Sequence, residues 1–79
     1  MKNVTIYSTS TCHFCQLAKE FFKTHNIAYT EYNVGTDADK RREMVDLTGQ
    51  LGVPVIRVGD EILVGFQEGK VAEMLGIPA

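Results

Sequence analysis

Apolar and polar residues are distributed along the chain in a way that predicts short strands separated by helices. The segment Val4–Ser8 is short, rich in β-branched and aromatic residues and free of charge, which is typical of a strand. From residue 14 onward, apolar residues recur at steps of three and four, which is the period of one helix face. These residues are Phe14, Leu17, Ala18, Phe21 and Phe22. The chain therefore predicts a strand followed directly by an amphipathic helix.

The middle of the chain predicts a second strand and a second helix. Residues 27–34 mix β-branched and aromatic residues with polar ones, as in a partly exposed strand. A helix is expected from about Ala38 to Thr48, with Thr36 or Asp37 as the cap that accepts a hydrogen bond from its first turn. Gly49 should end this helix, because glycine readily adopts the left-handed conformation that closes helices.

The last third of the chain predicts a hairpin and a final helix. Residues 53–58 and 61–64 are rich in β-branched residues, and the Gly59-Asp60 pair between them favours a tight antiparallel turn. The last helix is expected to begin near Gln67 and to stop before Pro78, which cannot continue a helix.

The element order is therefore β-α-β-α-β-β-α. A helix that connects two neighbouring strands makes them parallel, and the terminal hairpin extends the sheet in the antiparallel sense. We expect a single α/β domain over residues 1–79 with the thioredoxin fold, in which three helices flank a four-stranded mixed sheet.

Composition and charge limit the function classes. The 79 residues are 44% hydrophobic and 23% charged, which is an ordinary globular balance and fits one small domain. The net charge of −2 gives no support to binding of nucleic acid or anionic membranes. The amino-terminal residues lead straight into a strand without an apolar leader, and no stretch approaches the ~20 apolar residues of a membrane span. We therefore expect a cytoplasmic monomer that binds neither nucleic acid nor membrane.

The chemistry of the chain is concentrated in its two cysteines, Cys12 and Cys15, which are separated by two residues at the start of the first helix. Free backbone N–H groups and the positive end of the helix dipole stabilise a thiolate there. In such motifs the pKa of the first thiol is commonly lowered from about 8.5 to about 3.5–7.5. Residues three apart on a helix are neighbours, so the pair can close into a disulfide with little backbone movement. The spacing and position predict a redox site.

Three other interpretations of the cysteine pair are weaker. A zinc site needs four ligands, and completing it would require His13 and His25, although His13 lies inside the motif itself. A structural disulfide across so small a loop would remove little entropy from the unfolded chain. Two inert buried cysteines would be expected along the apolar face of the helix rather than at its start. We therefore expect no metal ion and no bound cofactor.

The chain resembles small bacterial glutaredoxins over nearly its whole length. The matching segments are Ile6-Tyr7-Ser8, Cys12-His13-Phe14-Cys15, Leu47-Thr48-Gly49-Gln50-Leu51-Gly52-Val53-Pro54-Val55-Ile56 and Val64-Gly65-Phe66. The resemblance implies that the peptide bond before Pro54 is cis and that Pro54 lies against the dithiol. It also implies that the backbone of Val53 pairs with substrate like a short added strand.

Several positions depart from the patterns of the related families. Thioredoxins usually carry a buried acid where this chain has Ile6, and glutathione-binding glutaredoxins usually carry a Lys or Arg where it has Thr9. In glutathione-binding glutaredoxins a second glycine follows the position of Gly65, and this chain has Phe66 there. A Phe at this position resembles the ribonucleotide-reductase hydrogen donors called NrdH-redoxins. In those proteins a basic residue follows the Phe, whereas this chain has Gln67. The electron donor is therefore either glutathione, as an external reductant, or a thioredoxin-reductase-type flavoenzyme.

The positions of the two cysteines on the helix predict which of them attacks a disulfide first. Cys12, the more exposed, is expected to be the nucleophile that attacks disulfide-containing protein substrates or mixed disulfides, and Cys15 the residue that resolves the mixed disulfide. His13 either favours the Cys12 thiolate when protonated or is a solvated side chain, whereas Tyr7 is expected in the core. The helix residues Lys19, Lys23 and His25 are expected to be ordinary surface positions. The predicted substrate-binding residues are His13, Phe14, Val53, Pro54, Gly65, Phe66 and Gln67.

Dithiol–disulfide exchange is the function that these residues favour. The alternative is a [2Fe–2S] carrier, in which Cys12 from two protomers and two external thiols would hold the cluster. A non-catalytic interaction domain is the third class, and an intact pair of cysteines argues against it.

Overall fold

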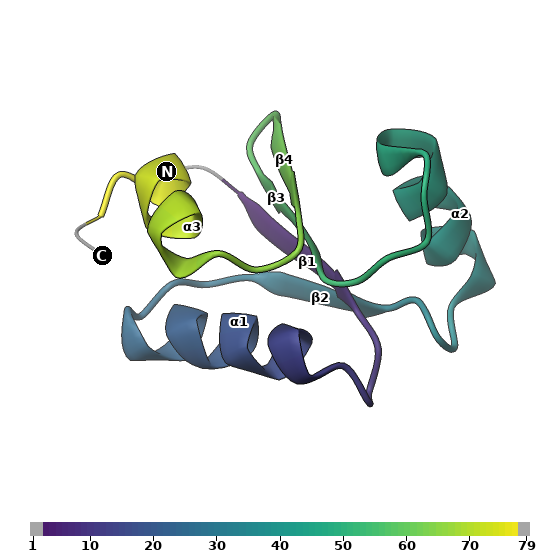
Figure 1. Ribbon diagram of the computed structural model, residues 1–79, viewed down its shortest axis with the longest axis horizontal. Helices are drawn as coiled ribbons and strands as arrows, with labels where there is room; N and C mark the ends of the chain where they lie inside the picture. The colour runs from purple at the N-terminus through teal and green to yellow at the C-terminus, as the bar shows by residue number, and fades with distance from the viewer. Residues whose placement is uncertain (1–2, 78–79) are drawn as a thin grey trace.

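The computed structural model describes residues 3–77, which form four strands and three helices in the predicted order. The strands are β1 (Val4–Ser8), β2 (Thr30–Asn33), β3 (Val55–Val58) and β4 (Glu61–Val64). The helices are α1 (His13–Thr24), α2 (Ala38–Thr48) and α3 (Glu68–Leu75) (Figure 1). The helix stop predicted at Pro78 lies outside the described residues.

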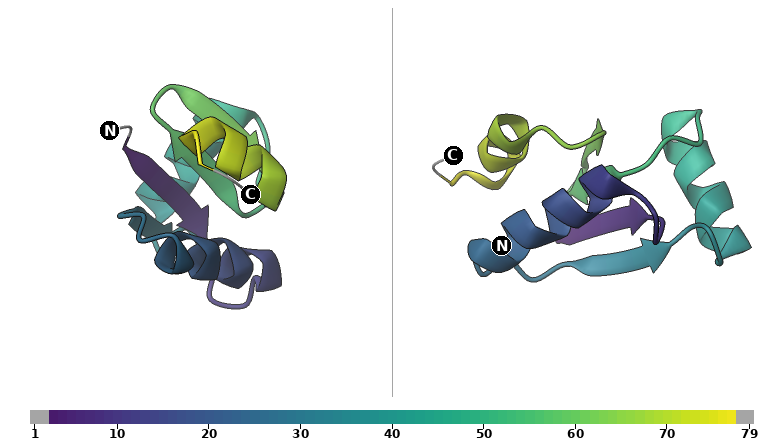
Figure 2. Two further views of the ribbon diagram at one scale, coloured as in Figure 1. Left: turned by 90° about the vertical axis from the view of Figure 1, so that its left-hand side faces the viewer. Right: turned by 60° about the horizontal axis from the view of Figure 1, so that its bottom comes forward.

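The strands form one mixed sheet in the order β2-β1-β3-β4. β1 and β2 are parallel, as the crossover through α1 requires, and the pairs β1–β3 and β3–β4 are antiparallel. The predicted thioredoxin fold is thereby confirmed. In the left view of Figure 2, α3 lies in front of the β3–β4 hairpin and α2 lies behind it.

The alternation of side chains along β1 divides the core between the two faces of the sheet. Ile6 belongs to the larger cluster, which also contains Phe22 of α1 and Val71 of α3. Tyr7 points the other way and packs with Met44 of α2. All five of these side chains are at most 1% exposed, so each face has its own apolar core.

Helix α2 has the predicted bounds because both of its ends are fixed by local chemistry. The side chain of Asp37 accepts a hydrogen bond from the backbone N–H of Lys40 at 3.0 Å. At the other end Gly49 adopts φ +73°, which few residues other than glycine tolerate. Asp37, and not Thr36, is therefore the cap.

Two strands are shorter than predicted. β2 begins at Thr30 rather than residue 27, because the N–H of Ile27 bonds to the carbonyl of Phe22 at 2.8 Å and so closes α1 instead of joining the sheet. β3 begins at Val55 rather than residue 53, since Pro54 has no N–H to give to a ladder. Among the helices of residues 3–77, none is long and apolar enough to cross a membrane.

Candidate functional site: a dithiol at the start of α1

Cys12 is the N-cap of α1 and lies between the loop after β1 and the first helical turn. Its backbone is extended, with φ −83° and ψ 114°, and its Sγ accepts a hydrogen bond from the backbone N–H of Cys15 at 3.2 Å. The cysteine side chain therefore takes the place of the usual Ser or Asp cap. A backbone N–H and the positive end of the helix dipole both favour a negatively charged sulfur at this position.

Cys15 has the opposite environment. Its side chain is fully buried, whereas Cys12 is partly exposed. Burial raises the pKa of the Cys15 thiol to about 12, and the hydrogen bond between the two cysteines acts in the same direction. Cys15 is consequently a neutral thiol at physiological pH, and Cys12 is the cysteine of the pair that is partly exposed to solvent.

Two segments that carry predicted substrate-binding residues meet at the same end of the sheet. One contains Val53 and Pro54, before β3, and the other begins at Gly65, directly after β4. The backbone N–H of Gly65 donates to the carbonyl oxygen of Pro54 at 2.7 Å, and the Val53–Pro54 peptide bond is cis, as expected. Val55 lies opposite Tyr7 near the end of β1, from which the chain continues toward Cys12. In Figure 1 these two segments pass the lower end of the β3–β4 hairpin, on the side where α1 lies.

Within this region Pro54 is fully buried, whereas Val53 is partly exposed and packs against the α2 side of the core. His13 and Phe14 are both exposed on the first turn of α1, with ring centroids 5.6 Å apart. Phe14 is 56% exposed and so is not part of the buried face of α1, although it has the apolar spacing. An exposed aromatic side chain next to a partly exposed cysteine is suited to contact with a partner protein.

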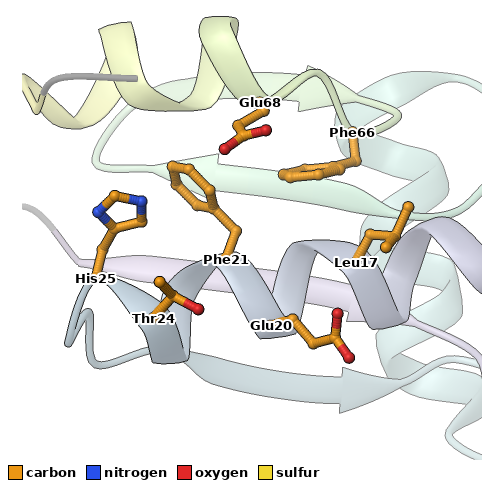
Figure 3. A pocket seen from close by; sticks show the side chains of 7 residues that line it. All are labelled: Leu17, Glu20, Phe21, Thr24, His25, Phe66 and Glu68. Atoms are coloured by element: carbon orange, nitrogen blue, oxygen red, sulfur yellow. The ribbon is translucent and has the colours of Figure 1, made fainter.

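Phe66 does not stand free in solvent. Its ring is partly buried against the larger core, in an edge-to-face arrangement with Phe21 at a centroid distance of 5.9 Å. Figure 3 shows Phe66 and Glu68 facing α1 across a hollow of about 250 Å³, whose lining also includes Leu17 and Phe21. The next residue, Gln67, is exposed at the N-cap of α3 and makes no side-chain cap hydrogen bond.

The prediction that Lys19 is an ordinary surface residue is wrong. Its side chain is only 16% exposed, and its Nζ lies 2.8 Å from Oε2 of Glu31 on β2. The same oxygen accepts a hydrogen bond from the hydroxyl of Ser8 at 2.8 Å. The spacing in the sequence indicates that Lys19 lies next to Cys15 on the helix, four residues on, but it does not indicate the pairing with Glu31.

The weak zinc interpretation finds no geometric support. His13 begins α1 and His25 caps its far end, so about 18 Å of helix separates them at 1.5 Å per residue. Within residues 3–77 no three His, Cys, Asp or Glu side chains gather in a way that could hold a metal ion.

The fold and the paired cysteines at the start of α1 define a redox protein of the thioredoxin-fold class. The glutaredoxin family model matches residues 4–63, which is most of the chain, so the protein belongs to the glutaredoxin family. The match covers the segments around Tyr7, Cys12 and Pro54 that carry the resemblance, and it ends before Val64-Gly65-Phe66.

Individual relatives support the same assignment. The chain is 40% identical over 72 residues to a glutaredoxin-like 8.6 kDa protein in a rubredoxin operon of Clostridium pasteurianum, covering 91% of this chain and 96% of that protein. It is 32% identical over 68 residues to glutaredoxin 3 of Escherichia coli, covering 86% of this chain and 82% of that protein. It is 31% identical over 74 residues to the glutaredoxin-like protein NrdH of Lactococcus lactis, covering 90% of this chain and 97% of that protein.

Solved structures of thioredoxin-like proteins and glutaredoxins superpose closely on this chain. A variant of a thioredoxin-like protein, 32% identical, superposes with a TM-score of 0.91 over 99% of this chain and 100% of that one. A glutaredoxin of Archaeoglobus fulgidus, 25% identical, superposes with a TM-score of 0.85 over 95% of this chain and 87% of that one.

Proposed function

We propose that this protein is a dithiol–disulfide oxidoreductase that reduces protein disulfides or mixed disulfides through Cys12 and Cys15. The observation that carries the proposal is the asymmetry of the two sulfurs. One is partly exposed and accepts a backbone N–H at a helix start, and the other is fully buried one turn further on. This is the arrangement that an attacking thiolate and a protected resolving thiol require.

The reaction has two exchange steps. In the first, the Cys12 thiolate attacks one sulfur of the partner's disulfide, which forms a mixed disulfide and releases the other partner sulfur as a thiolate that takes up a proton. In the second, Cys15 loses its proton and attacks Sγ of Cys12, so that the Cys12–Cys15 bond forms and the second partner thiol leaves. Two electrons pass from the protein to the partner, and an external reductant returns them.

Docking of the partner is assigned to the exposed residues around Cys12. An extended partner segment would pair with the backbone of Val53, in the manner of an added strand, and would contact the ring of Phe14. His13, Gly65 and Gln67 border the same region. A cycling dithiol is suited to a reducing compartment, and we therefore place the activity in the cytoplasm.

For the electron donor we propose a thioredoxin-reductase-type flavoenzyme rather than glutathione. Thr9 supplies no positive charge for a glutathione carboxylate, and Phe66 occupies the position of a glycine that would leave room for the γ-glutamyl backbone. A relative of similar length is called glutaredoxin-like protein NrdH, which agrees with this choice of branch.

The test compares two reductants on the same oxidised protein. We expect slow reduction by glutathione and faster reduction by NADPH with thioredoxin reductase, followed through the release of thiols from a disulfide-bonded protein substrate. Thr9→Arg should raise the glutathione rate if charge is the main obstacle, and Phe66→Gly should raise it if space is. Efficient turnover of the wild-type protein with glutathione alone would refute the proposed donor, and failure with both reductants would refute the proposed function.

A further inference from the structure

The ion pair of Lys19 links three elements on the α1 side of the sheet. Nζ of Lys19 on α1 donates to Oε2 of Glu31 on β2, and the hydroxyl of Ser8 on β1 donates to the same oxygen, both at 2.8 Å. Ser8 is 1% exposed, and the side chains of Lys19 and Glu31 are 16% and 37% exposed. This Lys19–Glu31–Ser8 network is therefore shielded from solvent on the sheet side and open at the edge of β2.

Strand register explains why a carboxylate is present on this face. Glu31 is paired with Ile6 in the parallel β1–β2 ladder, and the side chain of Ile6 packs in the core beneath α1. Ser8, two residues after Ile6, has the same orientation. The carboxylate of Glu31 is thus directed toward α1, where only a cation or a hydrogen-bond donor can satisfy it.

Lys19 is also electrostatically coupled to the buried cysteine. Residues four apart on a helix are neighbours, and the ammonium of Lys19 lowers the pKa of the Cys15 thiol against the larger opposing effect of burial. In the reciprocal direction, the hydrogen bond to Glu31 raises the pKa of Lys19 against the opposing effect of burial, and electrostatic interactions with Glu31, Tyr29 and Cys15 add to that rise. The Lys19 side chain therefore remains charged throughout the pH range of thiol exchange.

The coupling matters most after the first exchange step. In the reduced protein, the hydrogen bond and the charge of Cys12 both raise the pKa of Cys15. Once Cys12 is held in a mixed disulfide, it carries no charge and its effect is removed. The groups left to favour a Cys15 thiolate are the backbone of Thr9 and the ammonium of Lys19, while Lys23 acts on Glu31 rather than on the sulfur.

We propose that Lys19, held in place by Glu31 and Ser8, is a positioning residue that speeds the resolving step by stabilising the Cys15 thiolate. The inference rests on the proposed dithiol function. In this step the proton leaves Cys15, the new bond forms to Sγ of Cys12, the bond between Cys12 and the partner breaks, and the leaving partner thiolate takes up a proton. Lys19 keeps its own proton throughout.

A substrate that reports the two steps separately can test this role. The aromatic disulfide 5,5′-dithiobis(2-nitrobenzoate) releases one coloured thiolate when Cys12 attacks and a second when Cys15 resolves the adduct. For Lys19→Gln we expect the second release to slow more than twofold at pH 7 and its pH profile to move upward, because removing the positive charge raises the pKa of Cys15. The first release should stay within about twofold of wild type.

Three further variants make the test specific. Lys19→Arg keeps the charge and should restore most of the second rate, and Lys23→Gln removes an exposed charge on the same helix and should change neither rate. Glu31→Gln leaves the ammonium without its carboxylate and should slow the second release less than Lys19→Gln does. Thermal denaturation of each variant confirms that it is folded at the assay temperature.

The outcomes separate this inference from the proposed function. An unchanged second release and pH profile in Lys19→Gln, or equal slowing of both releases, would overturn the role of Lys19 while leaving the dithiol mechanism intact. A wild-type protein that releases only one coloured thiolate would instead refute the dithiol mechanism before any variant is made.

Discussion

Replacing Phe66 by alanine separates the two roles that this residue can have. In the structure the ring packs on the larger core and lies edge-to-face with Phe21 at 5.9 Å. Full burial of a phenylalanine side chain stabilises a protein by up to about 3 kcal/mol, so a partly buried ring contributes about 1 kcal/mol. An aromatic pair adds about 1 kcal/mol beyond the buried area. Phe66→Ala should therefore destabilise the protein by about 2 kcal/mol.

Such a loss is measurable in a domain of this size and leaves it folded. Single domains are stable by about 5–15 kcal/mol, and each kcal/mol shifts the melting temperature of a small domain by about 4–8 °C. Urea denaturation followed by circular dichroism should give the free energy of unfolding, and the melting temperature should fall by about 10 °C. The glutathione assay of any Phe66 variant must accordingly be run well below the lowered melting temperature.

Phe14 is the matched control, because it is an aromatic residue of the same size with 56% of its surface exposed. Phe14→Ala should change the free energy of unfolding by less than about 0.5 kcal/mol and should slow reduction of a protein disulfide by weakening docking. If Phe66→Ala were as mild as Phe14→Ala, the ring would not be packed on Phe21 in solution. Phe66 would then not be a structural part of the α1–α3 face.

Two further predictions concern the charged and capping side chains. Asp37→Ala removes the cap of α2, whose side-chain oxygen accepts a hydrogen bond from the Lys40 N–H at 3.0 Å. It should lower the free energy of unfolding, measured by urea denaturation, by about 1 kcal/mol. Asp37→Asn should keep most of this stability, and equal losses of stability in the two variants would show that the cap is not the cause. The hydrogen bonds from Lys19 and Ser8 hold the pKa of Glu31 below its usual range. These hydrogen bonds stabilise the folded state by at most about 1 kcal/mol, because the Glu31 side chain is 37% exposed and solvent screens its charge. This stabilisation should be complete above the unfolded pKa of Glu31 and be lost as the pH falls through the folded value. Glu31→Gln should remove this part of the acid dependence of stability, and an unchanged dependence would contradict the assignment.

Most of the fold could be predicted because local chemistry marks its elements. The bounds of α2 follow from a cap at Asp37 and a left-handed glycine at Gly49, and both features are visible as residue types at the right positions. The start of β2 could not be predicted, because residues 27–29 have strand-forming composition. Their conformation is decided by the closure of α1, where Asn26 adopts φ +56° and Ile27 bonds back to the helix.

Without the family resemblance, which supplied the cis bond before Pro54, the site was predictable only where its parts are close in the sequence. Cys12 and Cys15 lie within one helical turn of each other, so their spacing in the sequence alone indicates that they are neighbours. The partnership of Lys19 with Glu31 spans 12 residues and depends on which face of β2 meets α1. That face is fixed by the register of Glu31 against Ile6, which only the assembled sheet determines.

The most direct test of the dithiol account is to trap the mixed disulfide. Cys15→Ser, challenged with a disulfide-bonded protein substrate and analysed by mass spectrometry, should accumulate a covalent adduct on Cys12, because the second exchange step can no longer occur. Cys12→Ser should show no exchange, since the remaining thiol is fully buried and burial raises its pKa to about 12. A stable adduct on Cys15 in the Cys12→Ser protein, with activity retained, would contradict the assignment of nucleophile and resolving cysteine.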